Sequence, residues 1–140
     1  MGAFFWAIVA AGIWGLVPIL EKIGLSQVQP LVGLFYRCLG VFVGLIILPI
    51  FFLKGQQIRS VDLKSVMLLA LGGFLASFVA QIAFYRALKT GEVSRVVPIS
   101  GSYPFLAFLL GVMLLGESIS FGKLTGVVLV IVGIWLLKIS

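Results

Sequence analysis

Five long apolar segments fill almost all of this 140-residue sequence, and they decide which folds the chain can adopt. Each is close to the length of about 20 residues that an α-helix needs to cross the hydrocarbon core of a bilayer. The sequence is 62% hydrophobic and 10% charged, whereas a soluble domain is about half apolar and a quarter charged. We therefore predict an all-α polytopic membrane protein with transmembrane helices at residues 3–22, 31–53, 65–86, 96–116 and 121–139.

The first apolar segment lacks the basic start and the small-residue cleavage site of a signal peptide. We expect it to be retained as a span, so that residues 1–140 form a single transmembrane domain. The expected location is the cell membrane, inner or plasma, where the protein is multi-pass and the lipid bilayer is its first partner.

Charge and composition argue against several function classes. The net charge is +6, but the ten Lys and Arg residues, apart from Arg37, lie at segment ends, where long side chains reach the membrane surface. We therefore expect no nucleic-acid partner. The sequence has no histidine, and its four acids are scattered singly, so we expect no metal site and no cofactor. No nucleophile has a plausible base, and we expect no enzyme activity.

A few polar residues lie inside the apolar segments. Arg37 is about two helical turns inside the second span, where a charge must pair, reach the surface or face a wet cavity. Glu21, across a short loop, is its expected partner, and the pair is either structural or in contact with a substrate. Gln81 and Tyr85 are four residues apart and share a helix face. Because Arg86 extends this polar side, we favour a cavity-facing role over a simple bond between helices.

The first half of the fourth span is a poor helix. It contains Pro98 and Pro104, each of which leaves a backbone carbonyl without its helical partner. Ser100, Ser102 and Tyr103 are placed to bond these carbonyls or a ligand. Irregular backbone at membrane depth persists only inside protein or beside a cavity, and broken helices mark binding sites in transporters. We therefore favour a substrate site over two tolerated proline kinks.

Lys and Arg residues are divided almost evenly between the two membrane faces. Five spans place four of them on the N-terminal face: Lys54, Arg59, Lys64 and Lys123. The opposite face carries five: Lys22, Arg86, Lys89, Arg95 and Lys138. Because this bias sets orientation, so small a difference favours insertion both ways round, and two opposed copies would form an inverted repeat.

Several short motifs, in order, carry a family resemblance. They are Trp14-Gly15 through Lys22, Tyr36-Arg37, Tyr85-Arg86-Ala87-Leu88, Pro98 with Pro104, Leu115-Gly116-Glu117, and Leu124-Thr125-Gly126 with Ile131-Val132-Gly133. Together they resemble an EamA domain of the drug/metabolite transporter superfamily over essentially the whole chain.

The resemblance implies a five-helix unit that is one half of a ten-helix inverted-repeat transporter, an exporter or exchanger of small metabolites. Such units usually occur twice in one polypeptide, and this sequence contains one. That departure points to a homodimer, similar in logic to the small multidrug resistance proteins. Those relatives use a glutamate within the first helix for proton-coupled export. Here the first helix has only Glu21, at its end beside Lys22, which differs from that arrangement.

We therefore predict a transporter of small polar or amphipathic metabolites that works by alternating access as a homodimer. Its expected substrate-binding residues are Trp14, Pro18, Gln81, Tyr85, Ser100, Ser102 and Tyr103. The charge-pairing groups at the cavity mouth are expected to be Glu21, Arg37 and Arg86. The alternative is an accessory or scaffold subunit that transports nothing and docks its glycine-lined helix faces onto a larger membrane partner.

Overall fold

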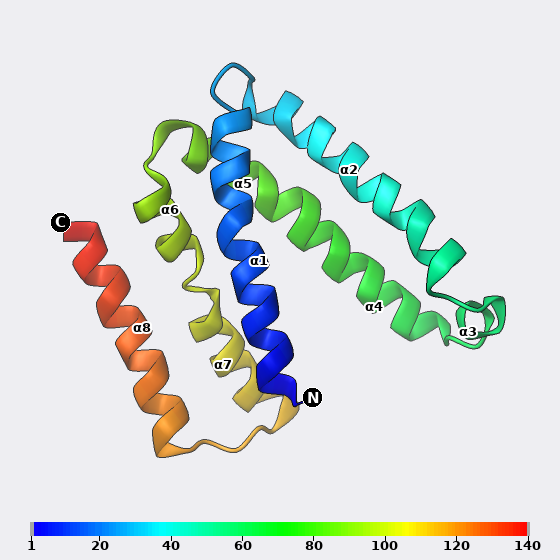
Figure 1. Cartoon of the computed structure of the whole chain (residues 1–140). Coiled ribbons are helices and arrows are strands. Elements are labelled where there is room, and N and C mark those ends of the chain that lie inside the picture. Colours follow the sequence, from blue (N-terminus) through cyan, green and yellow to red (C-terminus); the bar gives the residue numbers. More distant parts are fainter. Residues whose placement is uncertain (1, 140) are drawn as a thin grey trace. The chain divides into compact units, whose positions relative to one another are not determined.

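The computed structural model describes residues 2–139, apart from the side chains at positions 57, 59 and 138, and every regular element in that range is helical (Figure 1). The chain forms two compact units, one ending at Thr90 and the other beginning at Gly91. The predicted all-α architecture is confirmed.

The first unit contains three long helical spans. In chain order its elements are α1 (Ala3–Gly24), α2 (Pro30–Phe51), the short α3 (Gly55–Arg59), α4 (Leu63–Phe74), η1 (Leu75–Val79) and α5 (Ala80–Thr90). Pro30 stands at the first position of α2, where a helix needs no backbone N–H. Asp62 caps α4, because its carboxylate accepts a hydrogen bond from the Ser65 N–H at 3.0 Å. Both α1 and α2 contact α5.

The third span is continuous from Leu63 to Thr90, but its middle turn is not α-helical. In η1 the backbone follows a π-helix, in which the Ala80 N–H reaches back five residues to the Leu75 carbonyl. Such a turn widens the helix by about one residue and is common at functional sites. The sequence pattern had predicted an uninterrupted helix here.

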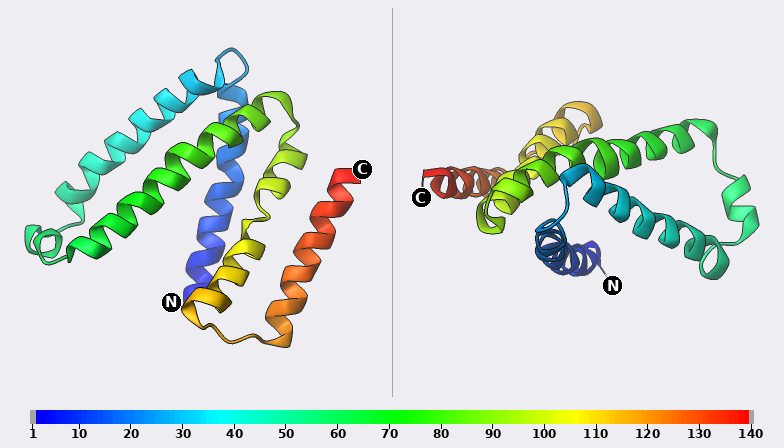
Figure 2. Two further views of the ribbon diagram at one scale, coloured as in Figure 1. Left: turned by 180° about the vertical axis from the view of Figure 1, so that it is seen from behind. Right: turned by 90° about the horizontal axis from the view of Figure 1, so that it is seen from above.

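The second unit contains the broken span that the prolines predicted. Helix α6 (Val93–Ser100) is followed by its C-cap residue Gly101, and α7 (Tyr103–Leu115) starts two residues after that cap. Pro104 is at the second position of α7, where its missing N–H costs no helical bond. The last helix, α8 (Phe121–Ile139), packs against both α6 and α7 (Figure 2).

Four helical segments are long and apolar enough to cross a membrane: Ala3–Gly24, Pro30–Phe51, Leu63–Thr90 and Val93–Leu115. The fifth apolar helix is shorter, over Phe121–Leu137. This arrangement agrees with the predicted five-helix polytopic protein, and the third span is longer at both ends than the sequence indicated.

Few residues are buried in either unit. Among the described residues, Pro18, Leu25, Leu34, Tyr85 and Leu88 are buried in the first unit, and Gly111 is buried in the second. Most other apolar side chains along the spans are exposed, as expected for surfaces that face lipid or another protein. A Cβ atom added at Gly40 or Gly44 would meet nothing within 4 Å, so this glycine pair packs against no helix in the described part of the chain.

Candidate functional site

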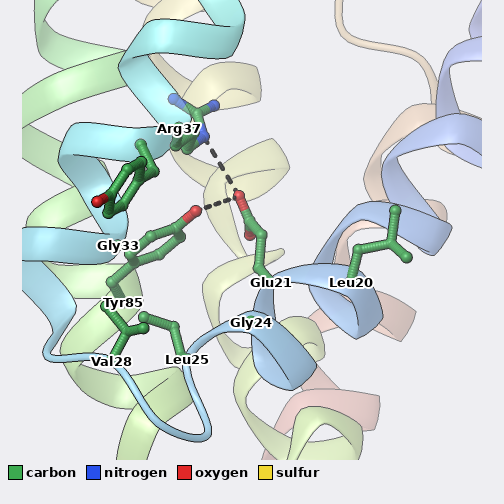
Figure 3. A pocket seen from close by; sticks show the side chains of 9 residues that line it. Leu20, Glu21, Gly24, Leu25, Val28, Gly33, Arg37 and Tyr85 are labelled. Atoms are coloured by element: carbon green, nitrogen blue, oxygen red, sulfur yellow. Dashed lines mark hydrogen bonds and ion pairs between the residues drawn. The ribbon is translucent and has the colours of Figure 1, made fainter.

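The candidate site is centred on the carboxylate of Glu21, in the last turn of α1. One oxygen, Oε1, accepts three hydrogen bonds from two other helices: Arg37 Nε at 3.2 Å, Gln81 Nε2 at 3.2 Å and Tyr85 Oη at 2.9 Å. The Glu21 side chain is 10% exposed and that of Arg37 is 28% exposed. Figure 3 shows Glu21 reaching from α1 toward Arg37 on α2 and Tyr85 on α5. The expected Glu21–Arg37 pair is therefore present, and it joins all three spans of the first unit.

A second bond fixes the guanidinium of Arg37. Its Nη1 donates to the Ser77 carbonyl at 3.2 Å, and Ser77 lies within the π-helical turn η1. A widened turn leaves backbone carbonyls available to side chains because the regular i to i+4 pairing is interrupted. The irregular turn thus supplies an acceptor for a charged side chain inside the membrane-spanning part of the unit. Sequence reasoning missed this contact, because residues 75–79 contain neither proline nor glycine.

A cavity of about 320 Å³ lies beside this carboxylate. Its polar lining comes from Glu21, Arg37, Tyr36 and Tyr85, and its remaining walls are Leu20, Gly24, Leu25, Val28 and Gly33. The volume is at the lower end of the roughly 300–1,000 Å³ typical of ligand pockets. A small molecule placed here would meet one carboxylate, one guanidinium and aliphatic walls.

Gly33 allows the close approach that forms one wall of the cavity. A Cβ atom at this position would lie 2.6 Å from Leu25 Cδ2 and 3.5 Å from Tyr85 Cε2. Real Cβ atoms do not approach other atoms as closely as the first of these distances, so a larger residue would push Leu25 or the helix away. Nothing in the sequence pattern had singled out Gly33.

Two lysines tie the ends of α1 and α5 together in a reciprocal way. Lys22 Nζ donates to the carbonyls of Leu88 at 2.6 Å and Lys89 at 3.3 Å, at the end of α5. Lys89 Nζ donates to three carbonyls just after α1, those of Leu25, Ser26 and Val28. Cations are favoured at helix C-termini, where unpaired carbonyls carry partial negative charge. The two lysines therefore link the C-terminal ends of α1 and α5 and oppose movement of one helix end away from the other.

The model of the family described as the EamA-like transporter family matches residues 1–139. The chain belongs to the EamA-like transporter family. The resemblance drawn from the sequence motifs is confirmed, and the protein is a multi-pass membrane transporter rather than an enzyme.

Relatives of the EamA-like chain fall into two lengths. It is 28% identical to an "Uncharacterized transporter in cobO 3'region" of Sinorhizobium sp over 137 residues, covering 96% of this chain and 95% of that protein. It is also 28% identical to an "Uncharacterized transporter" of Clostridium kluyveri, covering 91% of this chain but 41% of that protein. A transporter of the same name from Archaeoglobus fulgidus is 25% identical and is covered to 46%.

The EamA-like chain thus spans less than half the length of the last two relatives and nearly the full length of the first. A fourth relative, "Uncharacterized protein MJ1333.1" of Methanocaldococcus jannaschii, is 34% identical over 98 residues, which cover 70% of this chain and 71% of that protein. No solved structure matches the chain.

The structure brings four of the predicted site residues of the EamA-like chain together in the first unit. Glu21, Arg37 and Tyr85 line it, and Gln81 bonds to Glu21 without lining it, which is the bond between helices that we had ranked second. Two more predicted residues lie on α1 outside the lining: Pro18 is buried, and Trp14 is 64% exposed.

Of the remaining predicted residues, Arg86 is exposed on α5 and does not line the cavity. In the second unit, the Ser100 hydroxyl donates to the Val97 carbonyl at 3.0 Å, within its own helix. Ser102 is half-buried between α6 and α7, and Tyr103 is 58% exposed. Within the described residues, no group of three or more His, Cys, Asp or Glu side chains is placed to hold a metal ion.

Proposed function

We propose that this EamA-like chain carries small polar or amphipathic metabolites across the cell membrane by alternating access, as an exporter or exchanger, in the form of a homodimer. The observation that carries the proposal is the Glu21 carboxylate. It lies in a membrane-spanning helix, accepts three hydrogen bonds on one oxygen, and forms the wall of a cavity of about 320 Å³.

A purely structural role explains this network poorly. Removing two charges from water costs several kcal/mol per ion, and a buried ion pair is often no more stable than apolar residues of the same volume. Charged residues within membrane spans are therefore rare and lie mostly along substrate or ion pathways. Because the Glu21–Arg37 pair also lines a cavity, it fits a place on a substrate or ion pathway.

The second unit supplies a hinge in this proposal. The break between α6 and α7 separates two short helices at Gly101, with Pro98 and Pro104 on either side. Few bonds resist bending at such a break, so one bundle can tilt against another about it. Ser100, Ser102 and Tyr103 would then offer hydroxyl groups to a substrate, while Trp14 and Pro18 would contribute apolar surface.

Two lines of support favour a homodimer. The Sinorhizobium relative has nearly the same length as this chain, whereas the Clostridium and Archaeoglobus relatives are more than twice as long as the segment they share with it. Two copies would supply the spans that the longer transporters carry in one polypeptide. The near-even charge count of the two faces favours opposed copies.

Flux through reconstituted protein tests the transport proposal. Liposomes with purified wild-type protein, with Glu21→Gln or with Glu117→Gln would be loaded with a defined mixture of small metabolites, and efflux followed by mass spectrometry. We expect at least one compound to leave faster through the wild type than through protein-free liposomes. Glu21→Gln should abolish this flux, and the exposed-loop control Glu117→Gln should retain it. If no compound leaves faster, the accessory-subunit alternative replaces the carrier.

Cysteine accessibility tests the antiparallel arrangement. Ser26→Cys, in the loop before α2, and Gln56→Cys, in α3 after it, would be labelled from each side of intact cells in a Cys38→Ala background. Labelling of each site from both sides supports opposed copies. Labelling of each site from one side only would contradict them and leave a parallel dimer or a partner subunit.

A further inference from the structure

We propose that the loop between α1 and α2 forms a binding site for one primary ammonium group, and that Lys89 of α5 supplies this group as a tethered ligand. The site, called the carbonyl cage from here on, consists of the backbone carbonyl oxygens of Leu25, Ser26 and Val28. The inference goes beyond the proposed function and does not depend on transport.

The ammonium group of Lys89 has as many acceptors in the cage as it has donors. Its Nζ donates to the Ser26 carbonyl at 3.0 Å and to the Val28 carbonyl at 3.2 Å, and it also donates to the Leu25 carbonyl. A primary ammonium carries three N–H donors and no acceptor. The three carbonyls can therefore accept all of its hydrogen bonds.

The path of the chain after α1 leaves these carbonyls in need of a donor. Leu25 is the C-cap of α1, and the last carbonyls of a helix have no helical partner. Among the backbone hydrogen bonds of residues 2–139, the Leu25 carbonyl accepts one long bond, from the Val28 N–H at 3.4 Å, and the carbonyls of Ser26 and Val28 accept none. Because a backbone acceptor that is partly shielded from water is costly to leave unpaired, the loop requires a donor from elsewhere.

That donor comes from a distant part of the sequence. The three acceptors precede Lys89 by 61 to 64 residues, whereas a lysine that caps a helix usually bonds the last carbonyls of its own helix. The ion pairs of the described residues do not include Lys89. Its charge is therefore held by carbonyl dipoles of the loop and not by a carboxylate.

The cage suits an ammonium group better than a divalent metal ion. Its distances of 3.0 and 3.2 Å lie within the roughly 2.7–3.2 Å of N–H···O hydrogen bonds. They exceed the roughly 2.3–2.6 Å at which oxygen atoms bind Ca²⁺, an ion that also takes about six to eight ligands. Three carbonyls without a carboxylate form a poor site for such an ion.

Small ions can reach the cage from a cavity beside it. This cavity has a volume of about 170 Å³ and is lined by Lys22, Leu25, Ser26 and Lys89. A water molecule takes up about 30 Å³ in the liquid, so the cavity has room for a small amine when the Lys89 side chain is shortened. We therefore expect a free primary ammonium ion to replace the tethered one.

Chemical rescue tests the cage. Lys89→Ala removes three methylenes and the ammonium, and n-propylammonium contains the same heavy atoms. Cleavage of the purified full chain by proteinase K within residues 25–29 reports how often the loop opens. We expect Lys89→Ala to be cleaved about tenfold faster than the wild type, because charge-assisted hydrogen bonds are lost.

Added amine should reverse most of this effect. At about 0.1 M, n-propylammonium chloride should slow cleavage of Lys89→Ala at least about fivefold, because a ligand that binds only the intact loop stabilises it. Tetramethylammonium chloride at the same concentration carries the same charge but has no N–H donor, and it should leave the rate unchanged.

Lys89→Met and the wild type are the controls. Lys89→Met also lacks the ammonium, but its side chain occupies much of the space that the amine needs. It should be cleaved as fast as Lys89→Ala and gain no more than about twofold protection from n-propylammonium. The wild-type rate should change by less than about twofold in either salt, because its cage is already filled by a tethered group of high effective concentration.

The proposal is overturned if n-propylammonium does not slow cleavage of Lys89→Ala, or if tetramethylammonium slows it equally. If Lys89→Ala does not fold, competitive acetylation of wild-type lysines decides the question. Lys89 should then react at least about tenfold more slowly than the exposed Lys64, because the carbonyls must first release its ammonium. Equal rates would overturn the cage. Neither measurement uses flux, so a failure of the transport proposal leaves this one standing, and the reverse also holds.

Discussion

Removing the hydroxyl of Tyr85 tests the shortest of the three hydrogen bonds that the Glu21 carboxylate accepts. Tyr85 is 3% exposed, and its hydroxyl donates to Glu21 Oε1 at 2.9 Å. Tyr85→Phe keeps the ring against Gly33 and Leu25 and removes only this donor. The change therefore isolates one charge-assisted hydrogen bond in the network.

The expected loss of unfolding free energy is about 1.5 kcal/mol. Hydrogen bonds to charged groups contribute roughly 1.5–3 kcal/mol, and those between helices in a membrane average roughly 0.6 kcal/mol because the unfolded state also finds partners. Glu21 keeps its bonds from Arg37 and Gln81 in the variant, so its charge is not left unpaired. These considerations place the value at the lower end of the charged range, equivalent to about a tenfold change in the folding equilibrium.

Reversible unfolding in mixed micelles measures this loss, and Tyr36→Phe is the matched control. Tyr36 lines the same cavity but is 63% exposed, and its hydroxyl makes no hydrogen bond among those of the described residues. The unfolding free energy of the control should lie within about 0.5 kcal/mol of the wild-type value, as is usual for changes at exposed positions. Combining Tyr85→Phe with Glu21→Gln should show a coupling of about 1 kcal/mol. A loss no larger than that of the control, or no coupling, would refute the reasoning.

Three further changes test other parts of the structure. Lys89→Met removes three bonds to the carbonyls after α1, and limited proteolysis should cut residues 25–29 about tenfold faster because charge-assisted bonds of roughly 1.5 kcal/mol or more are lost. Gly116 has φ +66°, so Gly116→Ala should cost about 1–2 kcal/mol of unfolding free energy; Gly126→Ala, whose new Cβ meets nothing, should cost none. Hydrogen bonds from Ser65 lower the pKa of the Asp62 carboxyl. Its stabilisation is present above the unfolded pKa of about 3.9 and lost as pH falls through the lower folded value, so wild type should lose stability relative to Asp62→Asn only below about pH 4.

The sequence predicted the spans and the main ion pair for good physical reasons. Apolar length alone defines a transmembrane helix, and the α1–α2 loop is so short that Glu21 and Arg37 had to lie near each other. The break at Gly101 was equally predictable, because two prolines within seven residues remove helical bonds.

Other features depend on how the helices pack, which a single sequence does not encode locally. The π-helical turn at η1 has no sequence signal, and it is this turn that presents the Ser77 carbonyl to Arg37. Gln81 was expected to face a cavity, but the approach of α1 brings Glu21 within hydrogen-bonding distance of its amide. The lysine caps had a usable signal, since Lys22 and Lys89 lie in the last turns of their helices.

Blocking the cavity directly tests whether it is where the substrate binds. Val28 lines the cavity, so Val28→Cys in a Cys38→Ala background places one thiol in its wall, and Ile119→Cys places one in the exposed connection between α7 and α8. Both proteins would be reacted with a bulky maleimide and assayed for flux of the compounds that the wild type moves. We predict that labelled Val28→Cys loses this flux and that labelled Ile119→Cys retains it. Full flux through completely labelled Val28→Cys would contradict the account.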